Sequence, residues 1–147
     1  ETDERMMARV LAYALHADAA PVFTKGRVDG DEPELWARDL TDAITLCIDL
    51  GQPDETRMKR AASRAGRVVV LAYGSSNERW WAGVADKVAR LDNLEVRQLS
   101  SVSTDELARL AQRGMKLQIM IQDGDITVHG DAGEVRVELV TLKAARA

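Results

Sequence analysis

The chain contains a single cysteine, only two histidines, and no apolar run long enough to cross a bilayer. Cys47 has no partner for an internal disulfide, which favours a reducing, cytoplasmic compartment. A membrane-spanning helix needs roughly 20 consecutive apolar residues, so we expect no membrane association. His16 and His129 lie far apart in sequence and near no cysteine, which argues against a zinc site of ordinary spacing.

Glycine-rich phosphate loops are also absent. The segments 51–53 (GQP) and 74–76 (GSS) match neither the Walker nor the dinucleotide fingerprint. Segment 74–76 does lie between an apolar strand and an expected helix N-terminus, which is only a generic anion-binding geometry. The formal net charge of -4 argues against electrostatic binding of nucleic acid over the whole surface. It leaves a local basic patch possible.

The 147 residues, 46% of them hydrophobic, predict one globular domain spanning 1–147. A domain of this size buries about two thirds of its unfolded surface, so it can hold a core without disulfides. The chain opens on ETDE, without methionine and already in a helix-start pattern. We therefore expect residues upstream of Glu1 that this sequence lacks.

Hydrophobic periodicity predicts an α/β domain with a mixed sheet flanked by helices. In chain order the expected elements are a helix over 3–17, a loop over 18–33, strands over 34–40 and 44–50, a helix over 53–65, a strand over 68–73, a helix over 75–91, a strand over 94–99 and a helix over 103–114. Strand, helix, strand at this spacing indicates right-handed parallel crossovers. Capping boxes at 75–78 and 103–106 predict two of the helix starts.

The C-terminal segment changes to a period of two. Apolar residues alternate over 117–121, 126–128 and 135–139, with turn signals at Asp123-Gly124 and over 130–133. This pattern predicts an antiparallel meander with one buried face, and we assign it to the same mixed-sheet domain.

Two acidic residues are predicted to meet on the hairpin 34–50. With Thr41 and Asp42 as the turn, residues whose numbers sum to 83 face each other, so Glu34 lies opposite Asp49. Carboxylates on one rigid hairpin can bind a hard cation such as Mg²⁺ or Mn²⁺ through oxygen. Such an ion activates water and stabilises charge on a phosphodiester.

The order of these elements resembles the PD-(D/E)XK nuclease-like core. More closely, the blocks ETDERMM (1–7), DEPELW (31–36), LGQPDE (50–55) and IQDG (121–124) resemble the YaeQ family over essentially the whole chain. The resemblance implies a restriction-endonuclease-like fold and, before the first helix, an N-terminal stretch of strands that this sequence lacks. It implies no settled reaction.

The resemblance also implies a degenerate catalytic set. Gly51 stands where a nuclease of this type has lysine, two residues after the second carboxylate. Gln52, or Lys59 from the next helix, is predicted to replace that lysine. Glu4 is predicted to add a third carboxylate to the metal ligands Glu34 and Asp49.

Arginines recur at three- and four-residue spacing after Gln52. They are Arg57, Arg60, Arg64 and Arg67. One interpretation is a stripe that contacts nucleic-acid phosphates, with salt-dependent affinity. The other is the solvated face of a helix whose opposite side packs on the sheet.

Other candidates have simpler interpretations. Trp36, Trp80 and Trp81 can stack bases or serve as half-buried anchors, and Trp36 is placed on the face of Glu34. Cys47 is expected to be a small buried apolar residue. His16 is expected to place a cation at the end of the first helix, and neither histidine is assigned a catalytic role.

Two functions follow from these patterns. The first is metal-dependent phosphodiester hydrolysis or nucleic-acid binding on a degenerate nuclease core. The second is a non-enzymatic interaction module linked to transcription or other nucleoprotein machinery, suggested by the absent lysine and the acidic net charge. Fold resemblance alone does not choose between them.

Overall fold

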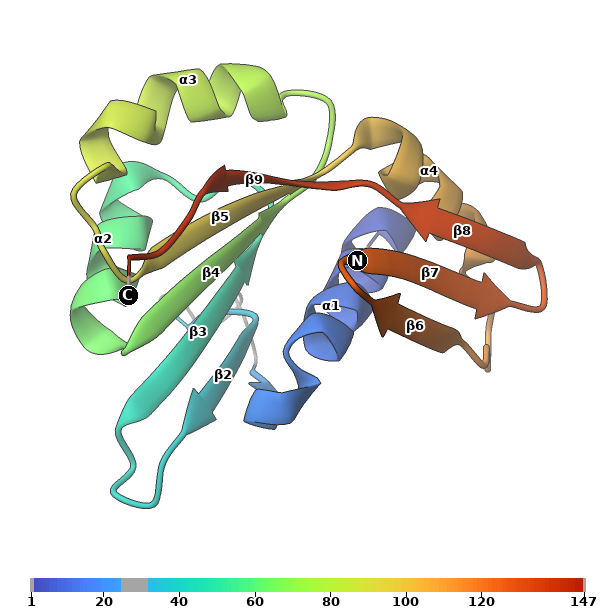
Figure 1. Cartoon of the computed structure of the whole chain (residues 1–147), viewed down its shortest axis with the longest axis horizontal. Helices are drawn as coiled ribbons and strands as arrows, with labels where there is room; N and C mark the ends of the chain where they lie inside the picture. Colours follow the sequence, from blue (N-terminus) through green and yellow to red (C-terminus); the bar gives the residue numbers. More distant parts are fainter. Residues whose placement is uncertain (1, 25–31, 147) are drawn as a thin grey trace.

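The structure, a computed structural model, describes residues 2–24 and 32–146, and Figure 1 shows the arrangement of its elements. Residues 25–31, which include most of the second half of the predicted loop, lie outside the described residues. Within the described ranges, no helix is long and apolar enough to cross a membrane.

The helices and strands follow the predicted order closely. They are α1 (Asp3–Leu15), the 3-10 turn η1 (Ala17–Ala19), β1 (Val22–Phe23), β2 (Leu35–Arg38), β3 (Ile44–Leu50), α2 (Glu55–Arg64), β4 (Arg67–Ala72), α3 (Asn77–Val88), β5 (Leu94–Leu99), α4 (Ser101–Leu110), β6 (Gln118–Gln122), β7 (Asp125–Gly130), β8 (Gly133–Val137) and β9 (Leu139–Lys143).

The main sheet has six strands in the order β1-β2-β3-β4-β5-β9. β3, β4 and β5 are parallel, which confirms the predicted crossovers, and the outer strands are antiparallel. The predicted pairing of Leu35 with Ile48 and of Trp36 with Cys47 is confirmed. The predicted two-residue turn at Thr41 and Asp42 was wrong, because the register shifts between Ala37 and Arg38 and residues 39–43 connect the two strands. The short strand β1 falls inside the predicted loop, where two strand residues are too few to give a periodic signal.

The predicted C-terminal antiparallel meander is confirmed, and it lies apart from the main sheet. β6, β7 and β8 form a separate three-stranded antiparallel sheet. The Asp123-Gly124 turn is confirmed, with φ of 52° and 84° at the two residues, as a two-residue hairpin requires. The chain then returns through β9 to pair with β5.

Three helices begin at residues other than those predicted. Pro53 precedes α2, whose N-cap is Asp54, with the carboxylate accepting from the Arg57 amide at 2.8 Å. The N-cap of α4 is Ser100, three residues before the predicted capping box. Ser76 caps α3 without a side-chain hydrogen bond. By contrast, Thr2 caps α1 as predicted, accepting from Arg5 at 3.1 Å.

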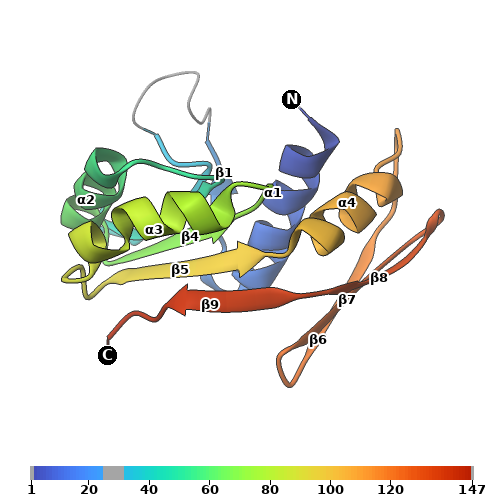
Figure 2. The same ribbon diagram turned by 90° about the horizontal axis from the view of Figure 1, so that it is seen from above.

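Two hydrophobic cores lie on the two faces of the main sheet. β3 divides its side chains between them, because successive residues of a strand point to opposite faces. Leu46, Ile48 and Leu50 pack with α1, α4 and the small sheet, whereas Cys47 packs with α2 and α3. Figures 1 and 2 show α2 and α3 on one side of the main sheet, and α1 and α4 between the other side and the small sheet.

His16, the C-cap of α1, is buried rather than exposed as a cation. Burial is the largest cause that lowers the pKa of His16 below 6.5, and the nearby positive charge of Arg67 lowers it further. The neutral imidazole is therefore favoured. Burial therefore opposes the expected role of His16 as a cation at the end of the helix.

This burial predicts an acid-sensitive contribution to stability. Below pH 6.5 the unfolded chain protonates His16 before the folded chain does, so stability is lost as pH falls. By pH 5.5 the loss attributable to His16 is at most about 1.4 kcal/mol. Urea unfolding at pH 7.5 and pH 5.5 measures it: His16→Gln should show a smaller drop than the wild type. Equal drops in the wild type and in His16→Gln would contradict this assignment.

Candidate functional site

The candidate site lies where β2 begins and β3 ends. The two strands are antiparallel, so Glu34, just before β2, and Asp49, near the end of β3, come to the same end of the hairpin. Both side chains are buried, with relative exposures of 6% and 9%. A buried carboxylate is costly unless it is paired, and the structure pairs each of them with arginine.

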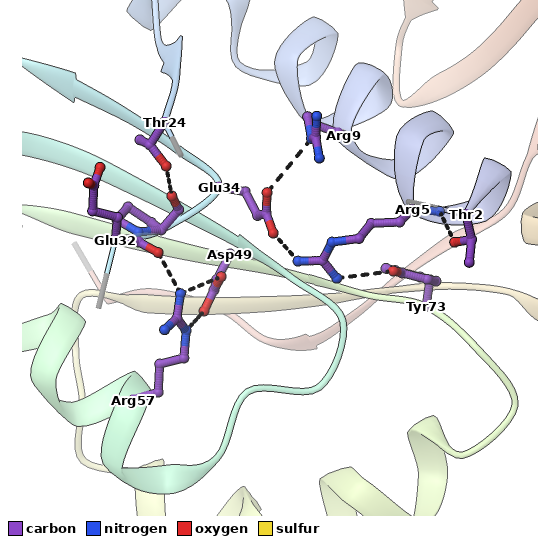
Figure 3. A network of polar contacts seen from close by, with 10 residues as sticks. Thr2, Arg5, Arg9, Thr24, Glu32, Glu34, Asp49, Arg57 and Tyr73 are labelled. Atoms are coloured by element: carbon purple, nitrogen blue, oxygen red, sulfur yellow. Dashed lines mark hydrogen bonds and ion pairs between the residues drawn. The ribbon is translucent and has the colours of Figure 1, made fainter. Parts of the chain in front are cut away.

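Glu34 is held by the first helix. The Arg5 guanidinium donates to Glu34 Oε1, and Arg9 Nε lies 3.7 Å from Glu34 Oε2. Arg5 also donates to the hydroxyl of Tyr73, just after β4, at 3.2 Å. Arg5 and Arg9 are one helical turn apart, so both reach from the same side of α1. Figure 3 shows this arrangement.

Asp49 is held by the second helix. Arg57 donates from Nε to Asp49 Oδ2 at 2.5 Å and from Nη2 to Oδ1 at 3.3 Å. The same Nη2 donates to the backbone carbonyl of Glu32 at 2.7 Å. This bidentate contact fixes the orientation of the guanidinium plane and holds its positive charge beside the carboxylate.

The carboxylates therefore point to helices on opposite faces of the main sheet, so the prediction that Glu34 and Asp49 share one sheet face was wrong. The amide of Glu34 donates to the carbonyl of Ile48 at 3.0 Å. In the predicted pairing, Glu34 would face Asp49, which is the next residue along β3. The strict alternation of the hairpin thus does not extend to Glu34. As a result Trp36 shares a face with Asp49 and lines the same cavity, while the Glu34 carboxylate contacts α1.

The donor set of this site does not fit a Mg²⁺ or Mn²⁺ ion as arranged. Such ions take several oxygen ligands, and both carboxylates here bind guanidinium groups instead. Across residues 2–24 and 32–146, no three His, Cys, Asp or Glu side chains are grouped so as to hold a metal.

The predicted helpers lie away from the two carboxylates. Gln52 donates to the side chain of Asn77 at 2.9 Å. Lys59 is exposed and pairs with Glu55 at 2.6 Å, one turn away on α2. Glu4 lines a separate cavity at the N-terminal end of α4, together with Tyr73 and Ser75. None of the three contacts Glu34 or Asp49 among the interactions of the described residues.

A cavity of about 370 Å³ opens between α2 and the main sheet, next to Asp49. Three arginines of the predicted stripe, Arg57, Arg60 and Arg64, line it. The fourth, Arg67, lies at the start of β4 and pairs with Glu95 at 2.8 Å. Arg60 and Arg64 are exposed on α2 and also line this cavity, so both interpretations of the stripe stay open.

Cys47 also lines this cavity. Burial, and next the charge of Asp49, raise the pKa of the Cys47 thiol to about 11. The thiolate is the reactive form, so a thiol with this pKa is a poor nucleophile at neutral pH. The expectation of a small buried residue is confirmed.

The arginine partners were the part of the site that sequence reasoning missed. The signal was present for one pair, since Arg5 and Arg9 stand four residues apart on the helix that carries Glu4. The contact between Arg5 and Tyr73 joins residues 68 positions apart, which no local pattern reveals.

Comparison with known proteins gives one consistent result. The family described as YaeQ protein matches residues 1–139. A relative in Salmonella typhi, described as uncharacterized protein YaeQ, is 40% identical over 140 residues, which cover 95% of this chain and 77% of the relative. The protein of the same description in Escherichia coli (strain K12) is 39% identical over 140 residues, which again cover 95% of this chain and 77% of the relative.

Two solved structures share the fold. The crystal structure of YaeQ protein from Xanthomonas axonopodis pv. citri matches with a TM-score of 0.92 and 44% identity, covering 98% of this chain and 82% of that one. The YaeQ protein from Pseudomonas syringae matches with a TM-score of 0.92 and 35% identity, covering 100% and 82%.

Proposed function

The chain belongs to the YaeQ family, and we propose that it binds nucleic acid through the arginine-lined cavity beside α2, on a degenerate core of the PD-(D/E)XK type. Guanidinium side chains bind phosphate groups, like carboxylates, through paired hydrogen bonds. The proposal concerns binding and does not require hydrolysis.

One observation carries the proposal: positive charge gathers in this cavity although the whole chain has a net charge of -4. The positive side chains of its lining are Arg38, Arg57, Arg60 and Arg64, and the negative ones are Glu32 and Asp49. The lining thus carries two more positive than negative charges. Such a local excess attracts an anion even where the surface as a whole repels it.

The arginine pairs favour binding over hydrolysis. A metal ion at Glu34 and Asp49 has to displace Arg5 and Arg57 from carboxylates that are almost completely buried. Gly51 has no side chain to stabilise developing charge, and Lys59 is engaged on the outer face of α2. The Mg²⁺ or Mn²⁺ ion predicted from the hairpin stays a prediction, and a cleavage assay tests it.

Salt dependence tests the binding. Anisotropy of a fluorescein-labelled single-stranded oligonucleotide, titrated at several KCl concentrations, gives the slope of log affinity against log salt. Each phosphate contact contributes about 0.7 to that slope for a single strand. The double variant Arg60→Met, Arg64→Met should flatten it by about 1.4 and weaken binding at low salt.

Lys59→Met is the matched control. It removes a charge from the same helix, outside the cavity lining, and should leave the slope unchanged. Absence of binding at low salt, or equal slopes for the wild type and the double variant, would refute the proposal.

The same oligonucleotide with Mn²⁺ tests hydrolysis. We expect no cleavage by the wild type or by the isosteric variant Glu34→Gln, Asp49→Asn. Cleavage by the wild type that the variant loses would establish the metal-dependent reaction instead. A folded wild type that neither binds nor cleaves would leave the interaction module as the better interpretation.

A further inference from the structure

The floor of the α2 cavity is apolar, which phosphate binding alone does not require. Its apolar side chains are Ile44, Cys47, Met58, Ala61, Val68 and Val70. They come from one face of β3 and β4 and from the inner side of α2, because Cys47 lies beside Val68 and Asp49 beside Val70 in the parallel register. An inorganic phosphate has no apolar group to place against such a floor.

An aromatic side chain stands at the same cavity. Trp36 lines it from β2, directly opposite Cys47, and is half-buried. The Arg38 guanidinium lies over the Trp36 ring, 4.3 Å from its centroid. Unstacked bases are held in proteins on aromatic rings and on arginine planes. Arg38 covers one face of the Trp36 ring, so a base in the cavity would stack on the face that this pair leaves uncovered.

The cavity is also large enough for more than a phosphate. Its volume of about 370 Å³ lies within the range of small-molecule sites. Arg60 and Arg64 line the cavity from α2 and bring charge beside the apolar floor. The lining therefore matches a ligand with a flat apolar body and an anionic edge.

From this combination we infer that the cavity holds one nucleoside monophosphate unit, with its base against Trp36 and the apolar floor and its phosphate at Arg60 and Arg64. The unit is either a free mononucleotide or the terminal residue of a strand. The strand form rests on the proposed function, whereas the free form does not depend on it.

Base dependence is the measurable consequence. Stacking of one base strengthens binding by about 5- to 150-fold. Calorimetric titration with thymidine 5′-monophosphate should therefore give a dissociation constant at least about 5-fold lower than titration with 2-deoxyribose 5-phosphate, which carries the same phosphate and no base.

Two variants change side chains that line the cavity, and a third serves as control. Ala61→Phe places a ring in the cavity and keeps every arginine. It should remove the difference in affinity between nucleotide and sugar phosphate and retain the salt slope for the oligonucleotide. Trp36→Leu should weaken nucleotide binding and leave sugar-phosphate binding unchanged. Trp81→Leu alters another half-buried tryptophan that does not line this cavity, and should behave as the wild type. Far-UV circular dichroism of each variant confirms folding.

An oligonucleotide with a 5′-phosphate, and the same strand with an abasic 5′-terminal residue, separate the two sources. Preference for the complete strand, with Trp36→Leu abolishing it, supports a terminal residue. Base-dependent binding of the mononucleotide without strand binding supports a free nucleotide and refutes the proposed function. If the oligonucleotide binds with the predicted salt slope and neither the mononucleotide nor the strand shows base dependence, the inference is overturned and the proposed function stands. If none of these ligands binds, both the inference and the proposed function are overturned.

Discussion

Replacing Arg57 by methionine is expected to lower the free energy of unfolding by about 3 kcal/mol. The Asp49 side chain is only 9% exposed and its carboxylate accepts two hydrogen bonds from Arg57. Methionine keeps the apolar length of the arginine and removes its charge, so the carboxylate is left buried without a counterion. Urea unfolding followed by circular dichroism measures the loss.

A second substitution separates the buried charge from the lost packing. In the double variant Arg57→Met, Asp49→Asn neither charge remains, so it should be more stable than Arg57→Met alone. Lys59→Met breaks an exposed pair on the same helix and should change stability by less than about 1 kcal/mol. Equal stability of the single and double variants would show that the Asp49 charge is not what the arginine compensates.

Leu11→Ala is expected to have an effect as large, about 2–5 kcal/mol. Leu11 is 1% exposed and belongs to the core that joins α1 to β3 on one side and to α4 and the small sheet on the other. Its truncation leaves a void where three layers meet, and a packed interior relaxes only partly around such a void. Thermal or urea unfolding quantifies the loss.

Val140→Ala is the matched control for this truncation. Val140 lies on β9 and is 55% exposed, so its replacement should change stability by about 0.5 kcal/mol or less. A loss for Leu11→Ala no greater than that of the control would contradict the central position assigned to α1.

The main sheet was predictable because its signals are local. β3 is a run of β-branched and apolar residues, and its bounds agree with the prediction at both ends. The pairing of Leu35, Trp36 and Ala37 with β3 agrees with the prediction, whereas the register shift after Ala37 has no local signal in the sequence. The family resemblance was equally accessible, since its motif blocks are short and specific.

Other features depend on contacts that no local pattern contains. The alternation of 135–139 runs on through Glu138, yet there the chain leaves one sheet for another. Long-range bonds decide the break: the Glu138 amide donates to Ser103 Oγ at 2.8 Å, and its carbonyl accepts from the Ser100 amide at 3.1 Å. Ser100 displaces Ser103 as helix cap because β5 ends at Leu99 and the helix starts at once.

The position of the two carboxylates at one end of the hairpin was predictable, but their orientation and their partners were not. Hairpin geometry brought Glu34 and Asp49 to one end of the sheet, as expected. Arginine side chains are long enough to reach from either helix, and their targets depend on how α1 and α2 sit over the sheet. Sequence spacing within one helix carries no such information.

The return of the chain through β9 has a consequence for synthesis. β5 gains its outer neighbour only after residues 139–143 have emerged, some forty positions later in the chain. Until then the backbone amides and carbonyls along that border of the sheet are open to pairing with another nascent copy. The strands β6, β7 and β8 are synthesised between β5 and β9, so they delay the pairing of β9 with the edge of β5. The risk of aggregation during translation is therefore concentrated in this late step.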